Sequence, residues 1–435
     1  MSFTIPGRVG TGKPAKDSQF FVSKRTPLPR AFHLKTSETL AGCRNSPGWS
    51  MPPLSAITIQ PELLRWACER SGLDGADLTH RFPQLPDWES GTTQPTLKQL
   101  ESFAKATYTP VGYLFLPEPP VENVPIPDFR AAANQRISHP SPDLLDTIYV
   151  CQQRQEWFRD YARVMGEQPL PFVGSARVED EVVSTAARIR SELGFDLDAR
   201  RQMPTWTDAL RHFIEQADGL GILVMCNGVV HNNNYRHLDP QEFRGFAMAD
   251  DIAPLVFING ADTKAGQMFT LAHELAHIWL GQSALSDSQA SALPDEKVER
   301  WCNEVAAELL VPIELMRRDY NPTAELQEEA NRLARRFKVS TLVILRRILD
   351  VGGISREDFW NAYDAEVARL RAIPRSSGGN FYLTQAARVS KRFAAALVSS
   401  TLEGQTRYTD AFRMLGFSKL STFKELGRTL GVGIT

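Results

Sequence analysis

The most regular hydrophobic pattern in the chain runs from Lys264 to Leu280. Its apolar residues recur at spacings of three and four, which places them along one face of an α-helix. These residues are Met268, Leu271, Ala272, Leu275, Ala276 and Trp279. Because Asp262 or Thr263 can cap the start and Gly281 can end the helix in a left-handed conformation, the pattern predicts a helix over this range.

Short apolar runs around this helix predict the rest of an α+β core. Three of them read as strands, because they are brief and are bounded by turn residues. They are "GLGILVMC" (219–226), "EFRGFAMAD" (242–250) and "PLVFING" (254–260). Downstream, "DEKVERWCNEVAAELLVP" (295–312) has a helical apolar stripe that Pro312 ends. We therefore expect a compact core over 201–320, with a small antiparallel or mixed sheet.

The regions on either side of this core have mainly helical patterns. Residues 56–120 predict five short helices around a Trp-Glu-Ser-Gly turn, and residues 121–200 predict a proline-rich linker followed by two amphipathic helices. Residues 321–435 predict further helices, including a second helix-turn-helix-like unit at 331–356. Residues 1–55 are rich in basic residues and have little periodicity, so we expect a disordered basic arm there.

The helix order of residues 56–120 resembles the helix-turn-helix of Cro/C1-type repressors. Its charge argues against DNA binding, because residues 57–119 hold five Lys or Arg against eight Asp or Glu, and DNA affinity depends largely on neutralising phosphates. The recognition helix would also contain Pro83 and Pro86, and a proline in a helix interior costs about 3 kcal/mol. We expect this module to contact proteins rather than DNA.

The charge of the C-terminal region has the opposite sign. Residues 331–356 hold seven Lys or Arg against one Asp, and residues 371–431 hold ten basic against three acidic residues. Clustered positive charge suits an anionic partner, such as DNA or the acidic face of a protein substrate. A solvated helical surface that balances the acidic N-terminal half explains the same composition, so both interpretations stay open.

The bulk composition excludes several classes of function. The net charge of −2 predicts no global attraction to nucleic acid or to an anionic membrane, and no apolar run approaches the roughly 18 residues that span a bilayer. The five cysteines are scattered without a CxxC pair, which argues against a disulfide framework or a thiolate zinc site. We expect a protein of the reducing cytoplasm without a membrane partner.

The predicted helix at 264–280 carries the strongest chemical signal, the motif HELAH. His273 and His277 lie four residues apart, so both imidazoles can reach one ion, and Zn–N bonds of about 2.0–2.1 Å require such proximity. Glu274 projects about 100° away around the helix axis, where it can act as a general base on a zinc-activated water. Two ordinary polar histidines are the alternative, but a chance HExxH is expected on the order of once in a hundred such chains.

A hydrolytic zinc needs a third protein ligand and one open position. The extended metzincin pattern would supply this ligand with Gly at position 280 and His at position 283. The chain has Leu280 and Ser283 instead, so that pattern is excluded and the ligand must come from another element.

The predicted helix at 295–312 offers three acidic candidates for the third ligand. Glu299 and Glu308 lie on opposite flanks of its apolar stripe, and Glu304 points more nearly outward. Asn303 lies one turn after Glu299, where its amide can hold a ligating side chain. We favour Glu299, with Glu308 second and Glu304 third.

These motifs together resemble a known family. "DDIAPLVFINGADTKAGQMFTLAHELAHIWLG" followed by "VERWCNEVAAELLVP", with "VPIPDFR" and "EFRGFA" upstream, is similar to the ImmA/IrrE family of zinc metallo-endopeptidases, especially members with an XRE-like (Cro/C1-type) helix-turn-helix in front. The likeness implies a zincin-like fold and a regulated protease that cleaves a repressor and so derepresses genes. By this likeness His273, His277 and Glu299 match the metal ligands, and Glu274 matches the catalytic glutamate.

Residues just upstream of the HELAH helix are further candidates for the site. His231, Tyr235, His237 and Arg244 could stabilise the oxyanion of a tetrahedral intermediate. In zincins an edge strand binds substrate as an added β-strand, and we expect "PLVFING" or "EFRGFAMAD" to provide it. The alternative function is a DNA-binding transcriptional regulator in which the metal site is a sensor or a relic.

Overall fold

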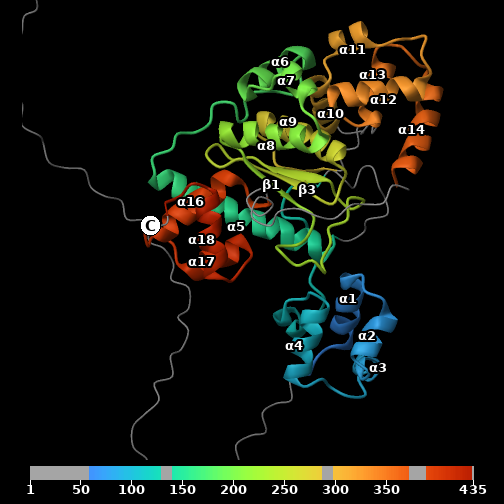
Figure 1. The fold of residues 1–435 in the computed structure, drawn as a ribbon. Coiled ribbons are helices and arrows are strands. Elements are labelled where there is room, and N and C mark those ends of the chain that lie inside the picture. The colour runs from blue at the N-terminus through green and yellow to red at the C-terminus, as the bar shows by residue number, and fades with distance from the viewer. Residues whose placement is uncertain (1–57, 129–139, 287–296, 372–387, 434–435) are drawn as a thin grey trace, which may run out of the picture. The chain divides into compact units, whose positions relative to one another are not determined.

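The computed structural model describes residues 58–128, 140–286, 297–371 and 388–433 (Figure 1). The arm predicted at 1–55 lies outside these residues. Within them the protein is mostly helical and contains one small sheet, which confirms a mixed α+β architecture. None of the described helices is both long enough and apolar enough to cross a bilayer.

Four short strands form one mixed sheet in the order β1-β3-β2-β4. The strands are β1 (Leu223–Asn227), β2 (Gly245–Met248), β3 (Leu255–Asn259) and β4 (Ala284–Ser286). β1 and β3 pair in parallel, whereas β2 pairs antiparallel with both β3 and β4. The three predicted strands are therefore present, and β4 is an addition that the sequence pattern does not predict.

One face of the sheet belongs to a hydrophobic core shared with four helices, of which α9 (Lys264–Leu280) and α10 (Lys297–Leu310) carry the candidate chemistry (Figure 1). The other two helices are α6 (Val182–Leu193) and α8 (Trp206–Leu220). Val224, Val256 and Ile258 of the strands join the same hydrophobic core. α9 is buried at every residue from 267 to 280, because it lies between the sheet and its neighbouring helices.

The opposite face of the sheet is covered by helices that are far apart in the sequence. They are α5 (Pro142–Val164), α16 (Lys391–Leu402), α17 (Tyr408–Leu415) and α18 (Leu420–Thr429). Met225, Phe246 and Phe257 of the strands pack against them in a second core. Because both faces are covered, the strands appear in the sequence as continuous apolar runs rather than as alternating patterns.

The ends of α9 follow from its capping residues. The Thr263 side chain accepts a hydrogen bond from the Gly266 N–H at 3.0 Å, and Gly281 ends the helix with a φ of 68°. The predicted range of this helix is therefore confirmed. The strand predicted at 219–226 starts too early, because α8 extends into this run before Gly221 ends it with a φ of 112°.

Three buried or half-buried arginines satisfy carbonyl groups at the C-terminus of α10. They come from α6, α7 (Leu197–Gln202) and α13 (Thr341–Asp350), and they donate to carbonyls that the end of a helix leaves unpaired. The contacts are Arg190 to Glu308 at 2.7 Å, Arg347 to Val311 at 2.9 Å, and Arg200 to Leu310. Positive charge at this end also complements the helix dipole, so α10 is firmly held.

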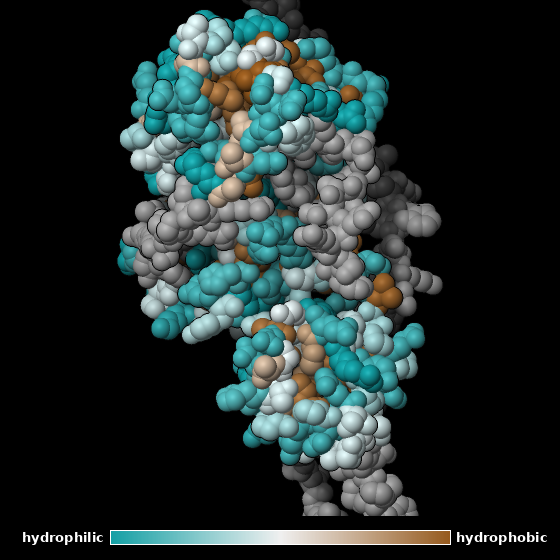
Figure 2. Space-filling model, turned by 90° about the vertical axis from the view of Figure 1, so that its right-hand side faces the viewer, coloured by the Kyte–Doolittle hydropathy of each residue, from teal (hydrophilic) through white to brown (hydrophobic). Residues whose placement is uncertain are grey.

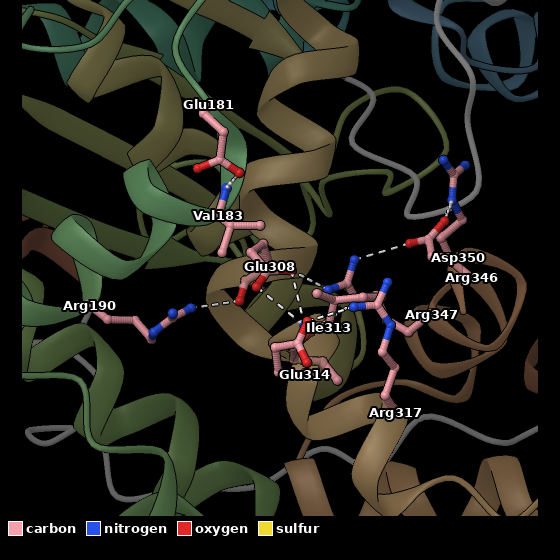
Figure 3. Close-up of polar contacts among 11 residues, drawn as sticks. Glu181, Val183, Arg190, Glu308, Ile313, Glu314, Arg317, Arg346, Arg347 and Asp350 are labelled. Atoms are coloured by element: carbon pink, nitrogen blue, oxygen red, sulfur yellow. Dashed lines mark hydrogen bonds and ion pairs between the residues drawn. The ribbon is translucent and has the colours of Figure 1, made fainter. Parts of the chain in front are cut away.

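The Glu308 side chain links the same end of α10 to α13. Its carboxylate accepts the Ile313 N–H at 3.1 Å and forms a buried ion pair with Arg347. Figure 3 shows the two arginines on different sides of Glu308: Arg190 donates to its backbone carbonyl and Arg347 to its carboxylate. Glu308, the second candidate ligand, is therefore a structural contact between helices.

The basic unit predicted at 331–356 forms the expected pair of helices, α12 (Leu326–Phe337) and α13, between α11 (Ile313–Asp319) and α14 (Arg356–Arg371). α13 is mostly buried in the core, unlike a recognition helix, which must present a face to the DNA groove. Several arginines of the unit pair with carboxylates. The pairs are Arg332 with Glu329, Arg336 with Asp319, Arg346 with Asp350 and Arg347 with Glu308. Much of the positive charge counted along the sequence is thus compensated in space.

Residues 58–116 form short helices around a small hydrophobic core. The elements are α1 (Pro61–Ser71), α2 (Gly75–Arg81), α3 (Leu85–Glu89), α4 (Leu97–Ala106) and a 3₁₀ helix, η1 (Val111–Phe115). Pro83 precedes α3, and Pro86 lies in its first turn, where proline is tolerated. Neither proline therefore lies in a helix interior, so the cost of an interior proline does not apply to α3.

Hydrophobic residues on the surface gather in separate patches between hydrophilic ones, as the face in Figure 2 shows. Within residues 58–116 the large exposed apolar side chains are Leu73, Leu97, Val111, Phe115 and Leu116. The net negative charge of residues 57–119 disfavours contact with DNA phosphates.

We expect Arg347→Met to lower the free energy of unfolding by about 3–5 kcal/mol, because it leaves the buried Glu308 carboxylate without its cation. Denaturant unfolding measures this change. Arg346→Met removes a more exposed ion pair with Asp350 on the same helix and should cost less than about 1 kcal/mol. Equal losses in the two variants would contradict a special role for the buried pair.

Gly245 allows β2 to approach α9 closely. A Cβ atom there would lie 2.5 Å from Thr270 Cγ2 and 2.7 Å from the Phe257 carbonyl oxygen. We expect Gly245→Ala to lower the free energy of unfolding by about 1–3 kcal/mol, because the strand must move away from the helix. Gly219→Ala, where a Cβ meets nothing within 4 Å, should be neutral or slightly stabilising in the same denaturant titration.

Candidate metal centre

α9 and α10 bring two imidazoles and one carboxylate together. His273 and His277 lie one turn apart on α9, with their Nε2 atoms 3.1 Å apart. Glu299, in the first turn of α10, places Oε2 at 3.2 Å from His273 Nε2 and Oε1 at 3.0 Å from His277 Nε2. Both histidines are completely buried and Glu299 is 5% exposed. The three side chains therefore converge on one small volume between the helices.

The spacing of these atoms fits a bound divalent ion. Ligand atoms at about 2.0–2.2 Å from a tetrahedral zinc are about 3.3 Å from one another, and the observed separations are close to this value. Among the described residues, His273, His277 and Glu299 form a group that could hold a metal ion. Two separately satisfied histidines would instead turn their Nε2 atoms toward different partners.

The electrostatics of the site favour the forms that bind a metal. Burial lowers the pKa of His277, which keeps its imidazole neutral. Burial alone would raise the pKa of Glu299, but the neighbouring His273 and His277 lower it below its usual value, so the carboxylate is ionised. A neutral imidazole and a charged carboxylate are the ligating states of these residues.

Glu274 is completely buried beside this group. Burial raises the pKa of its carboxyl well above the usual value, and the negative charge of Glu299 raises it further. Two carboxylates buried in one site repel each other, and a divalent cation between them would relieve this cost. The site therefore contains both a donor set and an adjacent group that can carry a proton.

The geometry separates the three acidic candidates of α10. Glu299 belongs to the donor group, whereas Glu308 is engaged with Arg347 near the other end of the helix, and Glu304 is exposed. Asn303 is buried one turn after Glu299, but the hydrogen bond expected between them is not among those formed by the described residues. Of the three, Glu299 is the one that lies in a group able to hold a metal ion.

None of the four candidates for oxyanion stabilisation belongs to the donor group found among the described residues. His231, Tyr235 and His237 are exposed on the loop after β1, at the sheet edge opposite β4, and Tyr235 is 92% exposed. Arg244 pairs with Asp262 at 3.0 Å, beside the start of α9. Their role in catalysis therefore stays a prediction.

The edge strand beside the donor group is β4, not either of the strands expected from the sequence. β2 and β3 are internal strands, so the expectation that one of them forms the open edge is wrong. Ser286 of β4 places its Oγ 3.5 Å from His277 Nε2, and the Leu285 N–H on the outer edge donates to the Pro127 carbonyl at 2.8 Å. A strand of three residues is too short to produce a periodic signal, which explains why sequence analysis missed both β4 and Ser286.

Comparison with known families identifies a peptidase-type domain around this centre. Residues 217–349, which include the sheet, α9 and α10, match the family Peptidase_M78, described as the IrrE N-terminal-like domain. Residues 389–429, which contain α16 to α18, match DUF8813, a domain of unknown function. No curated protein matches the chain. The match over 217–349 supports the ImmA/IrrE family and a metallopeptidase-type domain that encloses the buried His-His-Glu group.

Proposed function

We propose that the protein is a zinc-dependent endopeptidase with His273, His277 and Glu299 as metal ligands and Glu274 as general base. The observation that carries the proposal is the buried triangle of two imidazole nitrogens and one carboxylate, with a second carboxylate beside it. The peptidase-family match over 217–349 supports the same class of reaction.

The donor set favours zinc over the common hard cations. Two imidazoles and one glutamate form the His₂Glu set found at catalytic zinc in peptidases, whereas calcium and magnesium prefer oxygen ligands throughout. Three protein donors also leave a fourth position free, as a catalytic site requires. A structural zinc site would normally close that position with a fourth side chain.

Zinc, when bound, supplies a Lewis acid that polarises the scissile carbonyl and makes water a stronger acid. Glu274 accepts a proton from the attacking water as the water oxygen adds to the carbonyl carbon. The same carboxyl then gives this proton to the leaving nitrogen, the C–N bond breaks, and Glu274 returns to its starting state. Its position next to His273 on α9 keeps it within reach of the donor group throughout.

The substrate we propose is a protein, and more specifically a helix-turn-helix repressor whose cleavage derepresses genes. The resemblance of the HELAH helix and its neighbours to the ImmA/IrrE family supports this choice. A cytoplasmic location is consistent with it, since Cys68, Cys151, Cys226 and Cys302 are free thiols among the described residues.

A DNA-binding regulator with a relic metal site is less well supported. It would require an exposed basic recognition surface, but α13 is largely buried and several arginines of α12 and α13 are paired with carboxylates. A sensor or relic also has no need for Glu274 buried beside the ligands, where an uncompensated carboxylate is costly.

The purified full chain should bind one zinc ion per molecule. His277→Ala should weaken zinc binding by at least about 100-fold, because one of three protein ligands is lost. Metal analysis and competition with a chelator of known affinity measure both quantities. His237→Ala, a matched change at an exposed histidine, should bind zinc as the wild type does, and a similar loss there would contradict the ligand assignment.

Glu274→Gln should retain zinc and lose cleavage by a factor of at least about 10² to 10⁴, the usual contribution of a general base. The substrates to test are helix-turn-helix repressors encoded near the gene, incubated with zinc or with chelator and followed by mass spectrometry. Glu304→Gln makes the same chemical change at an exposed site on α10 and should cleave normally. Undiminished cleavage by Glu274→Gln would rule out its role as base.

A further inference from the structure

Ser286 occupies a constrained position under the candidate centre. It is completely buried at the end of β4 and pairs across the sheet with Gly245 of β2. Directly paired residues of neighbouring antiparallel strands project to the same face of the sheet. A Cβ at Gly245 would meet Thr270 and the Glu274 Cγ, so this is the face covered by α9, and the Ser286 hydroxyl is directed toward the site.

The absence of a side chain at Gly245 gives Ser286 access to the helix. Any larger residue there would occupy the space between β2 and Glu274, since a Cβ would already lie 3.3 Å from Glu274 Cγ. The Ser286 Oγ lies 3.5 Å from His277 Nε2, which places it at one corner of the donor triangle. The hydroxyl and the Glu274 carboxyl thus share one small buried space.

Binding of a metal leaves the Ser286 hydroxyl with one principal acceptor. His277 Nε2 is one of the three donor atoms, so its lone pair is used when an ion is held. Both oxygens of the neighbouring Glu274 carboxylate are buried without a hydrogen-bond partner among the described residues, and a hydroxyl so deeply buried is costly to leave unpaired.

We propose that Ser286 is a positioning residue for catalysis, whose hydroxyl donates a hydrogen bond to the Glu274 carboxylate and holds it toward the open side of the donor triangle. This inference rests on the proposed peptidase function and adds a residue that neither the motif nor the family match assigns. Its chemical role is to fix the orientation of the base before the substrate carbonyl arrives.

The rigidity of β4 suits this role. The strand is paired with β2 on one side, and its Leu285 N–H donates to Pro127 on the other. A donor on a doubly held strand limits rotation of the glutamate side chain more than a donor on a free loop would.

The inference predicts that loss of the Ser286 hydroxyl slows turnover without weakening metal binding. Ser286 is not one of the three donors, so its removal should leave the affinity for zinc unchanged. A misdirected Glu274 should instead slow the chemical step, because modest misplacement of a catalytic group costs about tenfold or more in rate. KM should change little, since Ser286 is buried beneath the position of the substrate.

The test uses the zinc-loaded full chain and compares Ser286→Ala with Ser283→Ala. Ser283 lies just before the same strand, but its hydroxyl oxygen accepts the Ala249 N–H at 2.9 Å, which makes it a matched control. Ser286→Thr keeps a hydroxyl and serves as the conservative variant. kcat and KM are measured on a peptide selected from a proteome-derived library, zinc affinity by chelator competition, and folding by thermal unfolding.

We expect Ser286→Ala to lose about tenfold in kcat with KM and zinc affinity within about twofold of the wild type. Ser286→Thr should recover most of this loss, and Ser283→Ala should behave as the wild type. An unchanged kcat in Ser286→Ala overturns the inference. A loss of zinc affinity in proportion to kcat overturns it as well, because Ser286 would then support the ligands rather than the base.

A binding measurement separates this inference from the proposed function. A peptide hydroxamate, which binds zinc and hydrogen-bonds to a neighbouring carboxyl group, should bind Ser286→Ala about tenfold more weakly than the wild type in calorimetry. If the wild type cleaves no peptide but this difference is present, the peptidase proposal fails while the Ser286–Glu274 contact stands. Equal hydroxamate affinities with normal cleavage by the wild type reject the contact alone.

Discussion

The packing of α10 against α9 is the constraint on which the candidate centre depends. The two histidines are set by one turn of a single helix, but the carboxylate comes from a different helix 22 residues further along the chain than His277. The three donor atoms converge only when both helices keep one relative position, to within a few tenths of an ångström. The chemistry of the site is therefore only as precise as this helix pair.

Two sets of interactions maintain that position. The sheet supports α9 from one side, and Gly245 lets β2 come close to the turn that contains Glu274. Arginines from three other helices hold the C-terminus of α10, and the ion pair between Glu308 and Arg347 connects it to α13. Buried charges of this kind stabilise little by themselves, but they penalise any arrangement in which they lose their partners. They specify the geometry of the helix that carries Glu299.

The C-terminal region illustrates why charge along a sequence is a weak guide to partners. The stretch 331–356 is strongly basic when read alone, yet four of its arginines contact acidic residues of α10, α11, α12 and α13. Likewise, α16 to α18 cover the second face of the sheet and contribute to its core. The basic composition of this region suggests an exposed surface, but many of its residues are buried in the hydrophobic cores.

The sequence alone determined the features that depend on neighbouring residues. Helical periodicity and capping residues fixed α9, and the four-residue spacing of His273 and His277 already implied a shared ligand site. The acidic ligand could only be ranked, because three glutamates on one helix have similar local surroundings. Tertiary structure distinguishes them, because Glu299 contacts both histidines whereas Glu308 pairs with Arg347. It also decided that β4 forms the edge and that Ser286 enters the site, since a strand of three residues exists only through its pairing with β2. Local periodicity records how a segment is built, whereas contacts between distant segments depend on the packing of the whole core.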